Sequence, residues 1–158
     1  MVQIQKVWYT ALMENIRKAL RIAKEAHGIT KDRGGADYIF HPIRVALGCE
    51  TAEEKVVALL HDVVEDTHIT LDDLRKELPP HIINAVDAIT RREGETYEDF
   101  VQRTKLDPIA RKVKILDLLD NLDESRMPSP ATEDDMERRI KYTRALAELE
   151  SDIYGKEN

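Results

Sequence analysis

The chain has 158 residues, which is the usual size of one domain with its own hydrophobic core. It carries 31 acidic and 24 basic side chains, a net charge of −7, so it lacks the overall basic charge of proteins that bind duplex nucleic acid. No run of about 18 apolar residues occurs, and the sequence therefore predicts no membrane span. The segment 1–6 has no signal-peptide layout, and the single cysteine, Cys49, cannot form an internal disulfide, which together predict a reducing cytoplasm.

Helical patterns run between clusters of glycine and proline, and no internal repeat or alternating β-type stretch interrupts them. A threonine followed by early acidic residues marks four helix starts, at Thr51, Thr70, Thr96 and Thr132. The expected helices cover about 8–27, 42–49, 52–66, 71–77, 80–89, 97–106, 108–124 and 133–154. We predict an all-α fold with short connections, in one domain over 1–158. Its core spans about 8–126, followed by a C-terminal helix over about 133–154.

The segment with the most chemical information is ALLHDVVEDT, residues 58–67, inside an otherwise apolar predicted helix. His61 and Asp62 are adjacent, and Glu65 and Asp66 follow one helical turn later, so all four can face one cavity. Burying four such groups without partners would be costly, whereas imidazole and carboxylate together suit a divalent transition metal. An additional acid can handle a water proton. The alternative is a core histidine followed by two acids at a solvated helix end.

Two further residues can complete a metal site. His41 is followed by a proline suited to the first turn of a helix, which places the histidine at the helix mouth. Asp117 lies in a predicted helix that apolar residues nearly surround, so we expect that helix to be central. Asp120 and Asn121 share a face with Asp117 by their spacing. For Asp120 the alternative is a solvated stripe on the helix surface.

These residues follow the H…HD…D order of the HD-domain metal-dependent phosphohydrolases. Additional residues narrow the resemblance to the hydrolase domain of the RelA/SpoT family, and within it to the stand-alone small alarmone hydrolases. Those residues are Ala26-His27-Gly28, Lys31-Asp32, Gly35, Tyr38-Ile39, His41-Pro42, Val45-Ala46, the segment from Leu59 to Thr67, and Val113-Lys114 with Asp117 and Asn121. The match covers about residues 19–126, and the Glu-Asp-Thr that follows the HD pair is much more specific than the pair alone.

The resemblance implies an all-α HD bundle that hydrolyses the 3′-pyrophosphate of guanosine tetra- or pentaphosphate and releases pyrophosphate. It assigns four ligands to one divalent metal, usually Mn²⁺ in this family: His41, His61, Asp62 and Asp117. Glu65 and Asp66 would orient and deprotonate the attacking water. Lys31 and Asn121 match positions that contact the phosphorylated nucleotide.

Two positions depart from the family's pattern. Thr30 stands where alarmone hydrolases commonly carry a basic residue that holds the base, and Leu118 replaces a basic residue after the ligand aspartate. These departures leave open an HD-type phosphohydrolase of another nucleotide. A non-catalytic module that binds metal and nucleotide is a further alternative, although Glu65 and Asp66 are both present.

Charge and packing raise two more expectations. Lys31, Arg33 and Arg44 lie near the loop before His41, where they can present a local positive pocket to an anionic substrate in an otherwise acidic protein. The helix over 133–154 can pack within the chain or form a dimer, and the sequence leaves the oligomeric state open. Its apolar residues are Met136, Ile140, Tyr142, Leu146 and Leu149.

Overall fold

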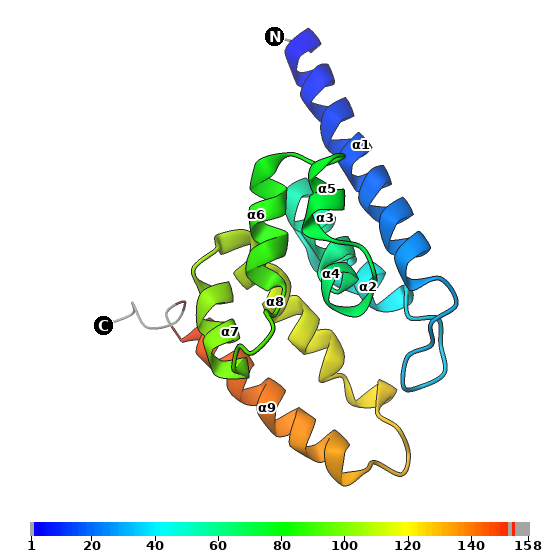
Figure 1. Ribbon diagram of the computed structural model, residues 1–158, viewed down its shortest axis with the longest axis vertical. Helices are drawn as coiled ribbons and strands as arrows, with labels where there is room; N and C mark the ends of the chain where they lie inside the picture. The colour runs from blue at the N-terminus through cyan, green and yellow to red at the C-terminus, as the bar shows by residue number, and fades with distance from the viewer. Residues whose placement is uncertain (1, 152, 154–158) are drawn as a thin grey trace.

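The computed structural model describes residues 2–151 and 153, with side chains from residue 9 onward. The predicted all-α fold is confirmed (Figure 1). The elements in chain order are α1 (Val2–His27), α2 (Phe40–Gly48), α3 (Ala52–Leu60), α4 (Val63–Asp66), α5 (Leu71–Arg75), α6 (Pro80–Ile89), α7 (Tyr97–Lys105), α8 (Pro108–Asn121), the 3-10 turn η1 (Glu124–Arg126) and α9 (Glu133–Glu150). Within the described ranges no strand forms, and one isolated bridge joins Lys31 to Asp37.

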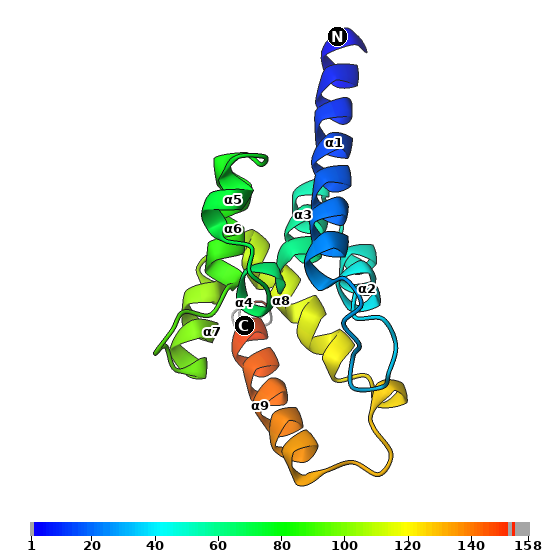
Figure 2. The ribbon, with the colours of Figure 1, turned by 45° about the vertical axis from the view of Figure 1, so that its right-hand side comes forward.

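Helix α8 is central, as its nearly continuous apolar surface predicts. It packs against α2, α3, α6, α7 and α9, while α1 packs along α3 (Figures 1 and 2). In both views the first turns of α1 project beyond the other helices. The main core lies where α3 meets α1, α2, α6 and α8, and it is built from aliphatic side chains such as Val57, Leu60 and Val86. No helix in the described part of the chain is long and apolar enough to span a bilayer.

A second apolar cluster joins the last three long helices. Phe100 of α7, Leu118 of α8 and Leu149 of α9 are buried in it, and Tyr142 and Leu146 pack against them. Helix α9 therefore packs within the chain through its predicted apolar face. Met136 and Ile140 on the same helix are about half exposed, so they do not take part in this packing. The expected helix end at 154 lies outside the described residues, and α9 ends at Glu150.

One expected helix is wrong as a single element. The predicted helix over 52–66 is broken at His61 and Asp62 into α3 and α4. The Nδ1 of His61 donates to the carbonyl oxygen of Ala58 at 2.6 Å, and an uninterrupted helix would offer that carbonyl to the amide of Asp62. The break therefore comes from the same histidine that the sequence marks as a metal ligand.

Helix boundaries elsewhere differ by a few residues. The helix expected over 108–124 ends at Asn121 and is followed by a separate 3-10 turn. The threonine caps are confirmed: Thr51 and Thr132 form capping boxes, and the hydroxyl of Thr96 accepts from the amide of Asp99. These caps set the direction of α3, α7 and α9, the helices that surround α8.

Candidate metal centre

Donor atoms from three separate parts of the fold converge at one point. His41 lies at the start of α2, His61 and Asp62 lie in the break between α3 and α4, and Asp117 lies in α8. The Nε2 atoms of the two histidines are 3.2 Å apart, and Oδ1 of Asp117 lies 3.0 Å from Nε2 of His41 and 3.4 Å from Nε2 of His61. Oδ2 of Asp62 lies 3.0 Å from Nε2 of His61 and 3.6 Å from that of His41. The structure thus brings together all four predicted ligands.

The second nitrogen of each imidazole fixes its orientation. Nδ1 of His61 donates to a backbone carbonyl, and Nδ1 of His41 donates to Oδ2 of Asp120 at 2.7 Å. Because both acceptors lack a proton to give, Nδ1 carries the hydrogen in each ring, and the Nε2 lone pairs face each other and two carboxylates. His41, His61 and Asp117 are buried and can hold a cation, and the partly exposed Asp62 adds a second carboxylate. Two imidazoles with two carboxylates are a donor set for a divalent transition metal.

The Asp117 carboxylate is held in its charged form by its neighbours. Nζ of Lys114 lies 2.7 Å from Oδ2, and Nδ2 of Asn121 donates to Oδ1 at 2.6 Å. Burial raises the pKa of Asp117, but the positive charge of Lys114 outweighs it and holds the pKa well below its ordinary value. Sequence reasoning assigned no role to Lys114, although its spacing of three residues from Asp117 on one helix was the available signal.

Asp120 does not belong to a solvated stripe on the helix surface, which was the alternative that the sequence left open. It binds three side chains instead. Its carboxylate is 12% exposed and accepts from His41, from Nε of Arg44 at 2.9 Å and from Arg126 at 2.7 Å. Burial raises the pKa of Asp120, but the hydrogen bonds from His41 and Arg44 lower it to about 2. An acid outside the predicted ligand set therefore orients one of the candidate ligands.

Asp62 is oriented from the loop that precedes α2. The hydroxyl of Tyr38 donates to Oδ2 of Asp62, and the ring of His27 packs against that of Tyr38 with 4.8 Å between centroids. Both aromatic residues belong to the set that carries the family resemblance. His27 and Tyr38 are not donors themselves, but through these contacts they hold the candidate ligand Asp62 in place.

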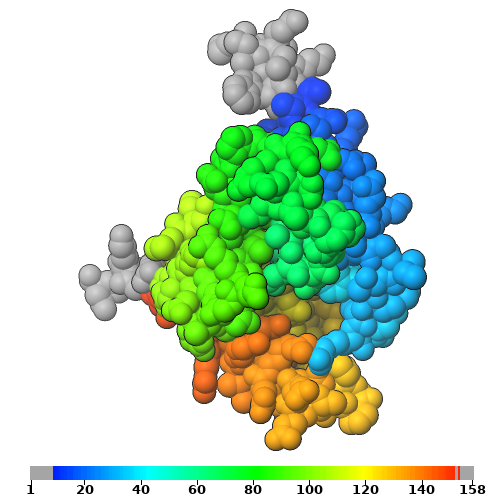
Figure 3. All heavy atoms as spheres, in the orientation of Figure 1, coloured from blue at the N-terminus to red at the C-terminus, as the bar shows by residue number. Residues whose placement is uncertain are grey.

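Glu65 and Asp66 lie in α4 at the rim of the site, and the residues 91–96 face them across a hollow of about 620 Å³. Glu65 accepts a hydrogen bond from the backbone amide of Arg91. Partial desolvation together with the charges of Asp62 and Glu65 raises the pKa of Asp66 to about 6. The space-filling view shows a depression between the green segment with α4 and α7, the orange α9 and the blue loop before α2, with α8 at its floor (Figure 3).

The basic residues near the loop before His41 do not form the expected positive pocket, because each is matched by an acid. Lys31 pairs with Asp37, Arg33 pairs with Asp135 at the start of α9, and Arg44 is bound to the carboxylate that orients His41. Lys31 remains exposed on the loop, and Asn121 is exposed at the end of α8. Both can therefore be reached from solvent beside the donor cluster.

The two departures from the family pattern lie in different environments. Leu118 is fully buried in the second apolar cluster with Phe100 and Leu149, so its side chain packs between α7, α8 and α9. Thr30 lies on the exposed loop, where its carbonyl accepts from the amide of Tyr38. Only the second departure adjoins the part of the site that the resemblance assigns to the nucleotide.

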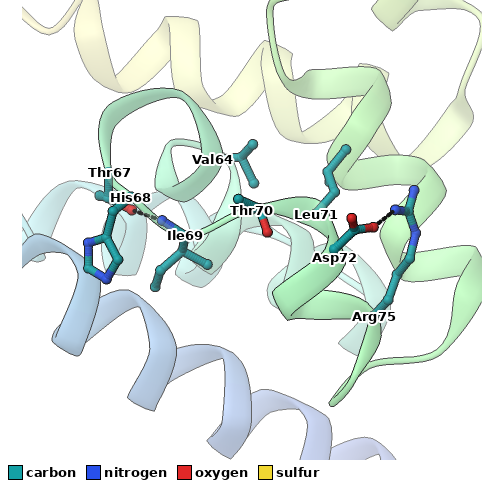
Figure 4. A pocket seen from close by; sticks show the side chains of 8 residues that line it. All are labelled: Val64, Thr67, His68, Ile69, Thr70, Leu71, Asp72 and Arg75. Carbon is teal, nitrogen blue, oxygen red and sulfur yellow. Dashed lines mark hydrogen bonds and ion pairs between the residues drawn. The ribbon is translucent and has the colours of Figure 1, made fainter.

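A smaller hollow of about 400 Å³ lies beside α4 and α5 (Figure 4). His68 lies at one end of it, and the ion pair of Asp72 with Arg75 lies at the other. None of the four candidate ligands lines this hollow, and it contains no second acid–histidine cluster like the one around α8.

Known proteins resemble this chain in sequence and in fold. No protein-family model matches it. Over 126 residues it is 32% identical to the guanosine-3′,5′-bis(diphosphate) 3′-pyrophosphohydrolase of Aquifex aeolicus, covering 72% of this chain and 18% of that protein. Over 127 residues it is 31% identical to a GTP pyrophosphokinase of Streptomyces coelicolor, covering 72% of this chain and 15% of that protein.

The fold is also found in a solved structure described as a metazoan ortholog of SpoT that hydrolyses ppGpp. The two chains superpose with a TM-score of 0.68 and 22% sequence identity, covering 85% of this chain and 84% of the other. The chain spans less than a fifth of the length of the two curated relatives, whose names describe different activities. The comparisons agree on sequence similarity to RelA/SpoT-type proteins and on a fold shared with the solved structure. The chain is thus an HD-type domain of the RelA/SpoT family.

Proposed function

We propose that this chain is a metal-dependent phosphohydrolase that acts on guanosine 3′,5′-bis(diphosphate), yielding GDP and pyrophosphate. The observation that supports this most is the convergence of four donor atoms from His41, His61, Asp62 and Asp117 beside an acid pair. The similarity to a curated 3′-pyrophosphohydrolase supports the choice of substrate.

The four converging residues would hold one divalent ion, and we propose Mn²⁺. Bound there, the ion would supply Lewis-acid polarisation of a phosphoryl oxygen and would lower the pKa of water. The residues that contact these four side chains keep them in place even when no ion is bound. Asp120 directs the imidazole of His41, Tyr38 directs the carboxylate of Asp62, and Lys114 with Asn121 directs that of Asp117.

Glu65 and Asp66 would position the attacking water and accept its proton. A carboxylate with a pKa of about 6, such as that of Asp66, is partly deprotonated near neutrality and is basic enough to accept a proton there. Burial raises the pKa of Glu65 as well, against the opposing effect of its hydrogen bond from the Arg91 amide. Because the two acids are neighbours, they would titrate as a coupled pair.

The nucleotide would enter the depression beside α8. Lys31 on the loop before α2 and Asn121 at the end of α8 are both exposed, and we assign them to nucleotide contacts. For Lys31 this requires exchange of its ion pair with Asp37 for an anionic group of the substrate. An exposed pair of this kind is worth little, about 0–1 kcal/mol, so the exchange is inexpensive.

A panel assay tests the proposal. The protein with Mn²⁺ is incubated with guanosine tetraphosphate, GTP, ATP and other phosphorylated nucleotides, and the products are separated by anion exchange. We expect GDP and pyrophosphate from the tetraphosphate, and no turnover by Asp62→Ala. Turnover of another nucleotide without turnover of guanosine tetraphosphate would refute the assigned substrate.

Thr30 on the loop before α2 offers no positive charge to a base, and this favours a second candidate, an HD-type phosphohydrolase of a different nucleotide. In that case the same panel would show metal-dependent release of phosphate or pyrophosphate from another nucleotide. Tight binding of a nucleotide without turnover would instead indicate a binding module.

A further inference from the structure

Three basic side chains lie close enough for their charges to interact. Arg138 and Lys141 belong to α9, and Arg91 belongs to the loop between α6 and α7 that lines the hollow with Glu65 and Asp66. Nζ of Lys141 lies over two aromatic rings, 4.7 Å from the centroid of Tyr97 and 5.5 Å from that of Tyr142. The cluster of Arg91, Arg138 and Lys141 is called the α9 basic cluster below.

The charges of the α9 basic cluster are not matched by acids. Neither Arg138 nor Lys141 makes an ion pair within the described ranges, and the guanidinium of Arg91 donates to the backbone carbonyl of Glu95. Burial and the charges of Arg138, Arg91 and Lys114 lower the pKa of Lys141, while Glu98 opposes them. This differs from the loop before His41, where every basic residue named above has a carboxylate partner.

The cluster is connected to the candidate active site through aromatic contacts. The rings of Tyr97 and Tyr142 lie 6.3 Å apart, and Tyr97 also packs against Phe100, over which Nζ of Lys114 lies at 5.4 Å. Lys114 in turn contacts the candidate ligand Asp117. The hydroxyl of Tyr97 is buried and has no hydrogen-bond partner among the described residues, so an oxygen acceptor brought by a ligand would satisfy it.

We propose that the α9 basic cluster, with the Tyr97 hydroxyl, is a subsite for the pyrophosphate group that the reaction releases. This rests on the proposed function. In an in-line displacement the attacking water and the leaving oxygen lie on opposite sides of the phosphorus. With the water at Glu65 and Asp66, the nucleoside then points away from the acid pair. The second phosphate of the departing pyrophosphate stays beside Glu65 and Asp66. Arg91 is close to this position, because its backbone amide donates to Glu65. Several phosphate oxygens facing several basic donors give the strong, charge-assisted hydrogen bonds that this cluster can offer.

The test measures binding of inorganic pyrophosphate by isothermal titration calorimetry at low salt, followed by steady-state kinetics. The variants are Arg138→Met and Lys141→Met, which replace side chains without structural ion pairs, and Tyr97→Phe, which removes only the unpartnered hydroxyl. Arg144→Met is the matched control, because Arg144 is exposed on the same helix and is not among the charges that act on Lys141. Arg91 is left unchanged because its loop holds Glu65.

We expect Arg138→Met and Lys141→Met each to weaken pyrophosphate binding about tenfold and Tyr97→Phe to weaken it without lowering the melting temperature. Arg144→Met should bind like the original protein. The subsite is refuted if the original protein does not bind pyrophosphate, or if the two α9 variants bind it as tightly as Arg144→Met does. If pyrophosphate binding depends on the cluster while no nucleotide is turned over, the subsite stands and the proposed function falls. If guanosine tetraphosphate is turned over with an unchanged KM in both variants, the function stands and the subsite falls.

Discussion

Nδ1 of His41 donates to the carboxylate of Asp120 at 2.7 Å, and this contact sets which nitrogen of the histidine faces the other candidate ligands. Arg44 and Arg126 bind the same carboxylate. The imidazole is therefore fixed by a residue three positions beyond Asp117 on α8. Helix α8 thus contributes one candidate ligand, Asp117, and three residues that position ligands, which are Lys114, Asp120 and Asn121.

Removing this support should weaken metal binding. Asp120→Ala deprives the His41 ring of its hydrogen-bond acceptor, and we expect the affinity for Mn²⁺ to fall by about 10- to 100-fold. Asp123→Ala is a matched control, because Asp123 also pairs with Arg126 but does not touch His41. Titration with Mn²⁺ followed by electron paramagnetic resonance measures both. Equal affinities in the two variants would show that Asp120 does not support the ligand.

Mutations should distinguish the role of Asp62 as a metal ligand from the role of Glu65 in accepting a proton. Asp62→Ala removes a donor from the cluster, so we expect it to lose both the metal and the activity. Glu65→Gln removes only a rim carboxylate, and we expect it to keep its metal while the rate falls by about 10²- to 10⁴-fold. Metal content after dialysis and turnover are measured on the same samples. Unchanged metal content in Asp62→Ala would mean that the ligand set is incorrect.

The activity should depend on pH through Asp66. Its pKa is raised from 3.8 to about 6 by desolvation and by the neighbouring acids. The proton-accepting form is the carboxylate, so it is depleted as the pH falls through about 6, and kcat/KM should fall about tenfold for each further unit. A profile from pH 5 to 8 measures this. Asp66→Asn should be slow throughout and should lack the inflection, and an inflection that persists in Asp66→Asn would assign it to another group.

Arg103 fixes the loop that faces the acid pair. Its guanidinium lies 2.8 Å from Oε1 of Glu95 and donates to the backbone carbonyls of Asp87, Ala88 and Thr90. The hydrogen bonds from Arg103 lower the pKa of Glu95 to about 2 from its ordinary value of 4.5. A depressed pKa stabilises the folded chain above the ordinary value, and this stabilisation is lost as the pH falls from about 4.5 to about 2.

Glu95→Gln should therefore lower the free energy of unfolding by about 1–2 kcal/mol at pH 7, and the difference from the original protein should shrink as the pH falls below 4.5. Denaturant titrations at several pH values measure it. Glu93→Gln is the control, because Glu93 lines the same loop and no ion pair is described for it. A difference that stays constant with pH would show that the Glu95 charge is not the cause.

Much of the fold follows from local patterns. The threonine caps predicted where α3, α5, α7 and α9 begin, because these signals satisfy backbone groups within a few residues. The apolar surface of the helix around Asp117 predicted its central place. The break at His61 was missed because it depends on a side-chain contact with the Ala58 carbonyl, which helical periodicity does not encode.

The order of His41, His61-Asp62 and Asp117 determined which residues could act as ligands, because residue types and spacing can be read directly from the sequence. Only the tertiary structure decided how charges elsewhere are partnered. It placed Asp120 against His41, and it neutralised Arg33 with Asp135. These pairings join segments far apart in sequence, and a charge acts over a few ångströms of space, so its partner is fixed only when the helices pack.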